Sequence, residues 1–459
     1  MPAIKPFPDD FLFGAATSAL QIEGSPLADG AGPSSWQLFC REPGRIDGGD
    51  HLEVACDHYH RYRDDVSLMQ SMGLNAYRFS IAWSRVLPTG RGRLNAKGLE
   101  FYQRLLDALE ESGLTPFVTL HHWDLPEALM AQGGWLNRDS AGWFSDYADL
   151  LYRSLGDRVR SWVTLNEPWV IVHMGFIEGT HPPGLHDPAS ARTATHNLLR
   201  AHGQAVQAFR ASGQGQIGLV VNLEPKYPAS ATAEDQAARD LSDAWMNRQF
   251  LEPVLRGQYP AALESIWGSD PCRVSAKDMA VIQSPIDFLG INYYSRSRTR
   301  KAAGVPYFGF ESVPPQGPVT DMGWEIYPEG LFDCLTHVHQ LAGDLPLYVT
   351  ENGAAFDDGP PQSGRIRDRR RVAYLKSHLR AAHRAMDLGV PLKGYFAWSL
   401  LDNFEWTYGY AKRFGLVHVD FATQARTLRD SALFYRDLIQ SRGANLFAET
   451  EDDAAEEAD

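Results

Sequence analysis

The sequence predicts an α/β protein built as a single (β/α)8 TIM barrel, and three observations support this prediction. Short apolar runs alternate with longer stretches of helical periodicity along the 459 residues. No Pro/Ser-rich linker divides the chain. Two of the apolar runs carry a glutamate at their end: Glu167 in WVTLNEP (162–168) and Glu351 in LYVTENG (347–353). The strands are expected to stop at Pro168 and Gly353. In a barrel of parallel strands, side chains at the carboxyl ends of the strands meet at one pocket.

Eight apolar runs are predicted as the barrel strands. Each is short, rich in β-branched and aromatic residues, and flanked by polar or turn-forming residues, as expected for strands buried on both faces. The runs span residues 11–17, 76–81, 116–122, 162–167, 217–223, 287–294, 347–351 and 395–400.

Between these runs, two segments have particularly clear helical signals. Residues 98–113 place apolar side chains at helical spacing, with Gly113 as the expected C-cap, and 328–341 begins with Pro328 at the first helical position. Residues 301–325 are rich in Gly and Pro and are predicted as a long loop after the sixth strand. Loops that follow barrel strands surround the active-site mouth, so this loop is expected to shape the outer substrate site.

The chain is predicted to form one domain over residues 1–447, followed by an acidic, disordered tail at 448–459 (AETEDDAAEEAD). Hydrophobic residues make up 44% and charged residues 22% of the chain, which is typical of a soluble globular protein. The net charge of −14 argues against a nucleic-acid-binding surface.

Several features predict a cytoplasmic protein. The four cysteines are widely spaced without a CxxC pair, which suits reduced thiols. The N-terminal segment lacks the pattern of a signal peptide, and no apolar stretch reaches 18 residues. We therefore expect neither a membrane nor a nucleic-acid partner, and homo-oligomer formation is left open.

Glu167 and Glu351, the two strand-terminal glutamates, are candidates for a pair of catalytic carboxyl groups. One such group can protonate a glycosidic oxygen while the other attacks the sugar or activates water. A general acid needs a pKa above the usual glutamate value of about 4.3, and a neighbouring carboxylate provides this shift. The alternative for Asn166-Glu167-Pro168 is an ordinary strand-to-helix corner, with Pro168 in the first turn.

Arg78, in the apolar run AYRFSI, is expected to be paired because a lone buried guanidinium is unfavourable. Pairing with Glu351 would keep that carboxylate ionised and oriented, whereas the alternative is a structural salt bridge to another acid. Asn292 and Tyr294 share one face of the sixth strand, and the Tyr294 hydroxyl is expected to reach Glu351 as well.

The histidines of LHHWDLP do not predict a metal site. His121 and His122 are adjacent on a strand and point to opposite faces, so both cannot bind one ion. His122 is instead a candidate donor to a sugar hydroxyl, with a buried structural histidine as the alternative. No metal or organic cofactor is predicted.

Aromatic and carboxylate side chains near the last strand are candidates for sugar recognition. Trp398 and Trp406 can stack against the apolar face of a pyranose ring, while Glu405 can accept hydrogen bonds from its hydroxyls. Gln21 would add a bidentate amide. Packing of the loop by an aromatic cluster is the alternative for either tryptophan.

Taken together, these motifs resemble glycoside hydrolase family 1, in its bacterial β-glucosidase branch. The resemblance covers almost the whole chain, through FLFGAATSALQIEG, DHYHRYRDDVSLMQSMGLNAYRFSIAWSRVLPTG, TLHHWDLPEAL, WVTLNEP, INYYS, VTENG, GYFAWSLLDNFEW and WTYGYAKRFGLVHVD. One departure is Leu20, where relatives often have tyrosine.

The resemblance implies a barrel enzyme that hydrolyses β-glycosides with retention through a covalent glycosyl–enzyme. Glu167 lies at the acid/base position and Glu351 at the nucleophile position. The residues that match the sugar-binding positions are Gln21, His122, Trp123, Asn166, Tyr294, Trp398, Glu405 and Trp406, and those that support the carboxylates are Arg78 and Asn292. The expected partners are small β-glucosides and cello-oligosaccharides, as in cellulose degradation, with β-galactosides and β-fucosides as further substrates.

Two branches of the family are disfavoured by single positions. Plant thioglucosidase relatives have glutamine in place of Glu167, and 6-phosphoglycosidases have serine and lysine around the position of Glu405. Unphosphorylated O-glycosides are therefore expected. The alternatives are a transglycosidase that uses the same two glutamates, a sugar-binding pseudoenzyme, and a metal-dependent barrel hydrolase.

Overall fold

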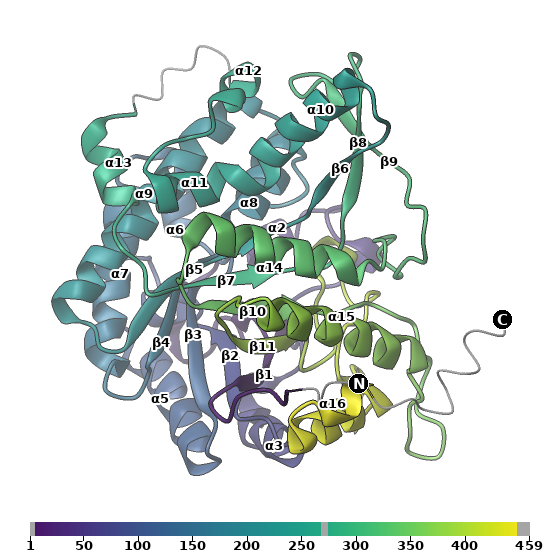
Figure 1. Cartoon of the computed structure of the whole chain (residues 1–459). Coiled ribbons are helices and arrows are strands. Elements are labelled where there is room, and N and C mark those ends of the chain that lie inside the picture. Colours follow the sequence, from purple (N-terminus) through teal and green to yellow (C-terminus); the bar gives the residue numbers. More distant parts are fainter. Residues whose placement is uncertain (1–4, 268–273, 448–459) are drawn as a thin grey trace.

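A computed structural model describes residues 5–267 and 274–447, so the predicted acidic tail at 448–459 lies outside the described residues. Eight parallel strands close into a barrel in the order β1-β11-β10-β7-β5-β4-β3-β2 (Figure 1). The strands are β1 (Leu12–Ala16), β2 (Ala76–Ser80), β3 (Thr115–His121), β4 (Ser161–Asn166), β5 (Gln216–Asn222), β7 (Phe288–Asn292), β10 (Leu347–Asn352) and β11 (Leu392–Trp398). The predicted (β/α)8 barrel is confirmed.

Each of these strands overlaps one predicted apolar run, and the differences lie at strand ends. β11 begins at Leu392, three residues before the predicted start, because the exposed Lys393 interrupts the apolar pattern there. β7 ends at Asn292 rather than at residue 294. The pairing of β7 with β10 shifts its register at Val349–Glu351, and Asn292 is the last residue of β7 that pairs with β10.

The barrel interior is packed with side chains from all eight strands. Phe117 lies at its centre, with ring centroids 5.2 Å from Phe288, 5.2 Å from Tyr348 and 5.1 Å from Phe396. Smaller side chains such as Ala76 and Val220 complete this cluster. Side chains therefore fill the barrel interior, and the place for a ligand-binding pocket is at the carboxyl ends of the strands.

Helices surround the barrel (Figure 1). The longer ones are α3 (His58–Ser71), α5 (Ala96–Glu111), α7 (Ser140–Leu155), α9 (Pro188–Ser212), α10 (Ala233–Asp243), α14 (Pro328–Ala342), α15 (Arg369–Asp387) and α16 (Asp430–Ser441). α5 and α14 correspond to the two predicted helices. Gly113, just beyond the end of α5, has a φ of +68°, which favours glycine at this position.

Shorter elements complete the described fold. They are α1 (Ala19–Ile22), α2 (Ser35–Phe39), α4 (Trp83–Val86), α6 (Glu127–Met130), α8 (Pro168–Val172), α11 (Gln249–Arg256), α12 (Glu264–Trp267), α13 (Ala276–Ile282), and the antiparallel pair β12 (Val417–Asp420) and β13 (Ala425–Leu428).

The prediction of a loop throughout 301–325 is wrong at 310–313. β9 (Phe310–Val313) pairs with β8 (Ser297–Lys301), which also pairs with β6 (Lys226–Pro228), and Figure 1 shows this small sheet beside α10. These strands lack a buried apolar face and are joined by backbone pairing and ion pairs such as Arg300–Glu311. A search for apolar strands therefore misses them.

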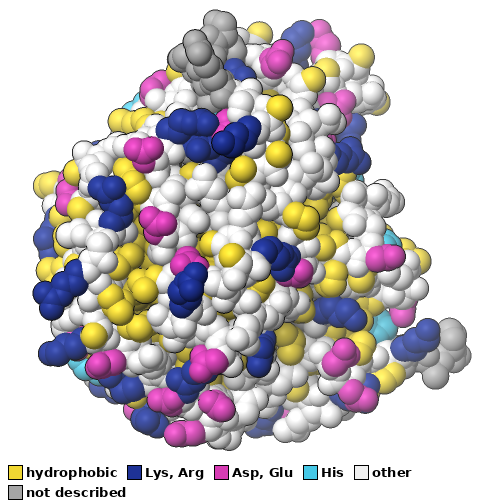
Figure 2. Space-filling view, turned by 90° about the vertical axis from the view of Figure 1, so that its left-hand side faces the viewer, with side chains coloured by type: hydrophobic (Ala, Val, Ile, Leu, Met, Phe, Trp, Pro, Cys, Tyr) yellow, Lys and Arg dark blue, Asp and Glu magenta, His cyan; other side chains and the backbone are white. Residues whose placement is uncertain are grey.

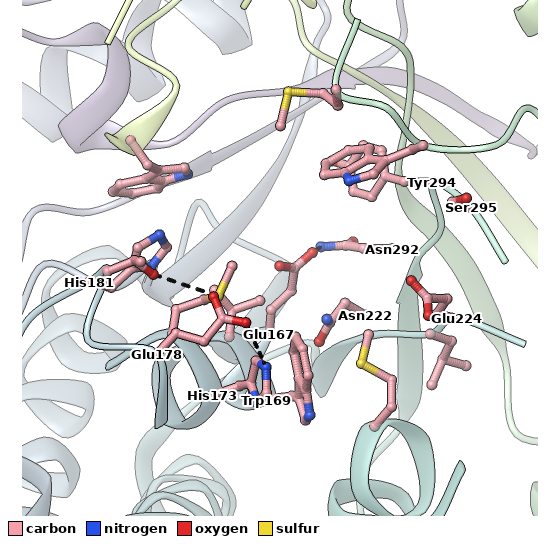
Figure 3. A pocket seen from close by; sticks show the side chains of 18 of the residues that line it. Glu167, Trp169, His173, Glu178, His181, Asn222, Glu224, Asn292, Tyr294 and Ser295 are labelled. Carbon is pink, nitrogen blue, oxygen red and sulfur yellow. Dashed lines mark hydrogen bonds and ion pairs between the residues drawn. The ribbon is translucent and has the colours of Figure 1, made fainter. Parts of the chain in front are cut away.

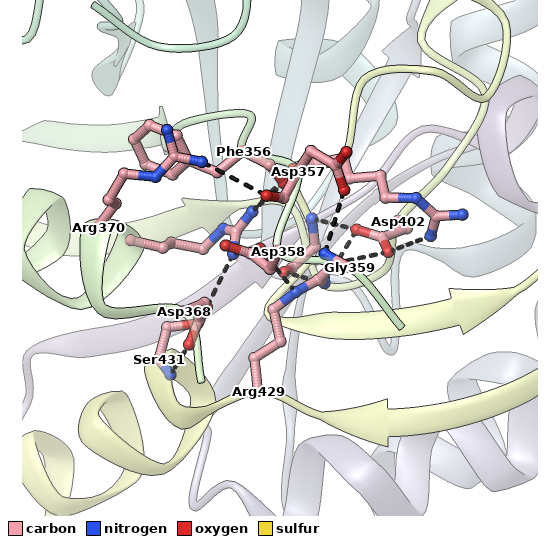
Figure 4. Close-up of polar contacts among 12 residues, drawn as sticks. Phe356, Asp357, Asp358, Gly359, Asp368, Arg370, Asp402, Arg429 and Ser431 are labelled. Carbon is pink, nitrogen blue, oxygen red and sulfur yellow. Dashed lines mark hydrogen bonds and ion pairs between the residues drawn. The ribbon is translucent and has the colours of Figure 1, made fainter. Parts of the chain in front are cut away.

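A buried network of three carboxylates and three guanidinium groups lies beside the end of β11 (Figure 4). Asp402 accepts hydrogen bonds from Arg413, Arg429 and the backbone N–H of Gly415. The network continues through Asp358, Asp368 and Arg371, which bonds to both of these aspartates. It connects the segment that follows β10 with the segment that follows β11.

The surface in Figure 2 has positive and negative side chains interspersed among apolar ones rather than gathered into a field of one sign. Within residues 5–267 and 274–447, no helix has the length and apolar character needed to span a bilayer.

Candidate active site

A pocket of about 480 Å³ opens at the carboxyl ends of the barrel strands. Its volume is typical of small-molecule sites. Figure 3 shows Glu167, Asn292 and Tyr294 together within it. Of the predicted site residues, those that line it are His122, Trp123, Glu167, Asn292, Tyr294, Glu351, Trp398, Glu405 and Trp406. Gln21, Arg78 and Asn166 are buried directly behind this lining and bond to it.

Glu167 follows β4 and is the N-cap of α8, with a φ of 45° and Pro168 as the first helical residue. Both readings of Asn-Glu-Pro therefore apply: it is a strand-to-helix corner, and the corner turns the glutamate into the pocket. Glu167 is 6% exposed, and its Oε1 accepts a 2.6 Å hydrogen bond from Asn292 Nδ2.

Burial raises the pKa of Glu167 to about 8, and the charge of Glu351 contributes further. The sequence interpretation gave the neighbouring carboxylate as the cause, whereas desolvation is the larger effect in the structure. A carboxyl group with this pKa keeps its proton at neutral pH.

Glu351, on β10, has a different environment. Its Oε1 accepts from Arg78 Nη1 at 2.6 Å and its Oε2 accepts from the Tyr294 hydroxyl at 2.6 Å. Burial raises the pKa of Glu351 as well, but the Arg78 guanidinium and the Tyr294 hydroxyl oppose this effect. Since no cationic side chain within residues 5–267 and 274–447 bonds directly to Glu167, the contacts make Glu351 the more acidic of the two.

Arg78 also orients the residue next to Glu167. Its Nη2 donates to Asn166 Oδ1 at 2.6 Å, which directs the Asn166 amide nitrogen toward His122. His122 Nε2 lies 3.0 Å from that nitrogen and must accept, so the proton of the neutral ring is on Nδ1.

His122 is neutral because burial and the nearby Arg78 hold its pKa well below the usual histidine value. Its Nδ1 has no hydrogen-bond partner among the described residues. His122 also lines the pocket, so its ring forms part of the pocket wall. His121 faces the other way and packs between Trp83 and Trp135, as the alternation of strand side chains predicts.

Gln21 and Glu405 form a second polar group at the pocket wall. Gln21 Nε2 lies 3.4 Å from Glu405 Oε2 and donates to Asn403 Oδ1 and the Phe404 carbonyl. Burial and the charge of Glu351 raise the pKa of Glu405 to about 8. Trp406 packs 4.4 Å from Trp123, so the predicted alternative of an aromatic cluster also applies, but both rings line the pocket.

The sequence interpretation missed much of the outer part of the pocket. This part includes Trp169, His173, Glu178, Asn222, Glu224, Lys226, Trp245, Trp324 and Phe414. Asn222 ends β5 and could have been found by its strand-terminal position, the signal that identified Glu167 and Glu351. Trp245 and Lys226 lie outside the predicted barrel strands, so no strand-end pattern identifies them as pocket residues.

Phe310, Met322 and Trp324 from the 301–325 segment line the pocket, consistent with the expected position of this segment at the mouth. Across the described ranges there is no cluster of three or more His, Cys, Asp or Glu side chains suited to holding a metal ion.

Comparison with known proteins gives the following similarities. The family described as Glycosyl hydrolase family 1 matches residues 3–444. The chain is 48% identical over 442 residues to Beta-glucosidase A from Thermotoga maritima, covering 96% of this chain and 99% of that protein. It is 47% identical over 442 residues to 1,4-beta-D-glucan glucohydrolase from Thermotoga neapolitana, with the same coverage of 96% and 99%.

The chain is also similar to solved structures. The Thermotoga maritima family 1 glycoside hydrolase complexed with a cyclophellitol analogue transition state mimic has a TM-score of 0.93 to this chain. The two are 48% identical, and the match covers 95% of this chain and 98% of that chain.

Proposed function

This chain belongs to glycosyl hydrolase family 1, and on that premise we propose that it is a retaining β-glucosidase in which Glu167 is the acid/base and Glu351 the nucleophile. The observation that supports these roles best is the contrast between the two carboxyl groups. Arg78 and Tyr294 bond to Glu351, while Glu167 has a pKa raised to about 8 and no direct cationic partner in the part of the chain that the structure describes.

In the first step, Glu351 attacks the anomeric carbon while Glu167 gives its proton to the departing glycosidic oxygen. The leaving group departs as an alcohol, and an ester forms between Glu351 and the sugar. Ester formation removes the negative charge of Glu351, which after burial is the largest cause of the raised pKa of Glu167.

In the second step, Glu167 acts as a base toward water. The water attacks the anomeric carbon, the ester bond breaks, and the sugar leaves with its original β configuration. Arg78 and Tyr294 then stabilise the carboxylate of Glu351 that is regenerated.

We propose that the inner pocket binds one terminal, non-reducing glucosyl residue. Trp398 and Trp406 offer stacking surfaces, Glu405 offers a carboxyl group held by Gln21, and the His122 ring lines the same pocket. Trp123, Asn166, Asn292 and Tyr294 complete the binding set. Small β-glucosides and cello-oligosaccharides are the proposed substrates, and β-galactosides and β-fucosides are proposed as further ones.

Unphosphorylated sugars are favoured because Glu167, Glu351 and Glu405 share the pocket. A phosphate would add negative charge beside the carboxylate of Glu351, whose charge already raises the pKa of Glu405. We further propose a single domain over residues 1–447, since the strand nearest the N-terminus, β1, pairs with β11. A cytoplasmic location is supported by the free thiols of Cys40, Cys56 and Cys334.

Leaving-group dependence tests the two roles. Glu351→Ala is expected to abolish turnover of every β-glucoside. Glu167→Ala is expected to lower kcat/KM by about 10²- to 10⁴-fold on alkyl glucosides, and far less on 2,4-dinitrophenyl β-glucoside, whose leaving group needs no proton. Equal losses on the two substrates would refute the acid role of Glu167.

Transglycosylation is a second candidate, because Phe310, Met322 and Trp324 give the pocket mouth an apolar character that suits alcohol acceptors. The same glycosyl–enzyme would form, and an alcohol would compete with water for it. Product analysis with added alcohol decides between the two. Predominant alkyl glucoside at millimolar alcohol would indicate a transglycosidase, and predominant glucose a hydrolase.

A further inference from the structure

His173 connects two tryptophans of the outer pocket wall with a glutamate at its rim. The His173 ring stacks on Trp169, four residues earlier, with a centroid distance of 4.3 Å and an interplanar angle of 16°. Trp245 Nε1 donates to His173 Nδ1 at 3.2 Å, and His173 Nε2 lies 3.1 Å from Glu178 Oε1. Figure 3 shows Trp169, His173 and Glu178 on one side of the pocket.

These contacts define a single neutral tautomer of His173. An indole N–H can only donate, so His173 Nδ1 must accept and the ring proton lies on Nε2. That proton is directed at Glu178, and this hydrogen bond is the main reason why the pKa of Glu178 is lowered. Trp245, His173 and Glu178 therefore form a directed hydrogen-bond chain.

The hydrogen bonds of Trp245, His173 and Glu178 lie on the side of the pocket from which an aglycone departs. α8 begins directly after Glu167, which gives the proton to the aglycone oxygen in the proposed mechanism, and His173 is the C-cap of this short helix. Trp169, on the second helical position, lies between them. The wall formed by Trp169, His173 and Trp245 thus begins at the acid and leads outward toward Phe308, whose ring lies 5.2 Å from Trp245.

We propose that His173 is a positioning residue for aglycone selectivity: it holds the Trp169 and Trp245 rings as a wall that binds aglycones with a flat, apolar ring face. This inference rests on the proposed β-glucosidase function. Two kinds of aglycone have such a face, an aryl group and the pyranose ring of a second glucosyl residue. Polar side chains that also line the pocket, Asn222, Glu224 and Lys226, favour the hydroxylated ring of a glucosyl aglycone.

The test compares three β-glucosides that share the glucosyl group and differ in the aglycone: methyl β-glucoside, 4-nitrophenyl β-glucoside and cellobiose. In His173→Ala, kcat/KM for cellobiose is expected to fall about five- to tenfold more than kcat/KM for methyl β-glucoside, the range given by loss of an aromatic contact. A selective loss on the nitrophenyl substrate instead would identify aryl aglycones as the ligands.

Two further variants separate the hydrogen bonds from the ring. His173→Phe keeps a ring that can stack on Trp169 but cannot accept from Trp245, and Trp245→Phe removes the indole donor together with part of the ring. If the bond positions the wall, the double variant loses less selectivity for cellobiose than the sum of the two single losses. The matched control is Trp143→Phe, which changes a buried tryptophan that does not line the pocket and is expected to leave all three values unchanged.

Two results would overturn the inference: equal losses on cellobiose, the nitrophenyl glucoside and methyl β-glucoside, or additive effects of His173→Phe and Trp245→Phe. Failure of the wild-type protein to hydrolyse any of the three glucosides would instead refute the proposed function. The two failures are therefore distinguishable.

Discussion

Glu167 and Glu351 are both buried glutamates in one pocket, yet their neighbours differ in charge. Arg78 and Tyr294 stabilise the ionised form of Glu351, whereas among the described residues only the Asn292 side chain donates to Glu167. The pH dependence of catalysis follows from this difference. The acid limb of kcat/KM reports ionisation of Glu351, and the basic limb, near pH 8, reports loss of the proton from Glu167.

Replacing Arg78 by Met is expected to move the acid limb to higher pH, by about one unit or more. The guanidinium lowers the pKa of Glu351, so its removal raises that pKa, and a larger fraction of Glu351 is protonated and inactive at low pH. The measurement is the pH profile of kcat/KM on an aryl β-glucoside. Tyr294→Phe should shift the limb in the same direction by less, and Arg78→Lys should shift it least. An acid limb unchanged in Arg78→Met would contradict the assignment.

The residue-level predictions from sequence depended on strand ends. Glu167, Glu351 and Asn166 were identifiable because each ends or directly follows an apolar run, and all strand ends of a parallel barrel meet. His173 and Trp245 could not be identified in this way. They lie in helical segments, and nothing in their local sequence distinguishes them from core aromatic residues.

At the level of elements, the ends of β10 and β11 approach each other closely at Gly353. A Cβ built on Gly353 would lie 1.7 Å from the Trp398 carbonyl oxygen, so only glycine fits between the nucleophile strand and the strand that ends in Trp398. This contact explains why a glycine follows Glu351-Asn352.

Gly353→Ala is expected to lower the free energy of unfolding by about 3 kcal/mol, because the clash is with backbone atoms that cannot rotate away. It should also reduce kcat/KM more than tenfold, since Glu351 and Trp398 would both move. Gly142→Ala is the control: the added Cβ meets no neighbouring segment within 4 Å, and alanine in the first turn of α7 should stabilise by up to about 1 kcal/mol. Thermal unfolding and aryl glucoside kinetics measure both effects, and similar behaviour of the two variants would contradict this account.

The buried network around Asp402 fixes the segment that contains Glu405. Asn403, directly after Asp402, accepts a hydrogen bond from Gln21, which in turn contacts Glu405. Asp402→Asn is therefore expected to raise KM several-fold, and breaking the buried pairs should lower the free energy of unfolding by about 3–5 kcal/mol.

Asp65→Asn provides a matched comparison for Asp402→Asn. Like Asp402, Asp65 is fully buried and paired with an arginine, Arg426, but it lies in α3 rather than in the segment that contains Glu405. A similar loss of stability with unchanged KM is expected. Denaturant unfolding and glucoside kinetics at 25 °C would check both variants, and an unchanged KM in Asp402→Asn would exclude a positioning effect of the network.

Element boundaries show what sequence patterns could and could not predict. The eight barrel strands were predictable because burial on both faces requires continuous apolar runs. β8 and β9 were not, because Arg298, Arg300 and Glu311 give them no apolar face and their pairing depends on a neighbouring strand, β6.

At the scale of the whole molecule, the amino end of the barrel contributes to stability, and the carboxyl end holds the pocket. The N-terminal segment packs at the amino end of the barrel: Phe7 is fully buried, with ring centroids 4.7 Å from Phe11 and 5.2 Å from Phe13 and His383. Its backbone N–H donates at 3.0 Å to the carbonyl of Arg442, just beyond α16. The pocket lies at the opposite end of the strands.

Phe7→Ala is accordingly expected to lower the free energy of unfolding by about 3–5 kcal/mol while kcat and KM at 25 °C stay within twofold of wild type. Urea unfolding together with glucoside kinetics provides the measurement. A change in KM without loss of stability would contradict the separation of the two barrel ends.

The central claim is that Glu167 and Glu351 act on one anomeric carbon from the same pocket in two successive displacements. The most direct test is a ¹H NMR time course of the hydrolysis of an aryl β-glucoside by the wild-type protein, recorded faster than glucose mutarotates. The β-anomer of glucose is predicted as the first product. First appearance of the α-anomer would mean a single displacement and would contradict the covalent role of Glu351.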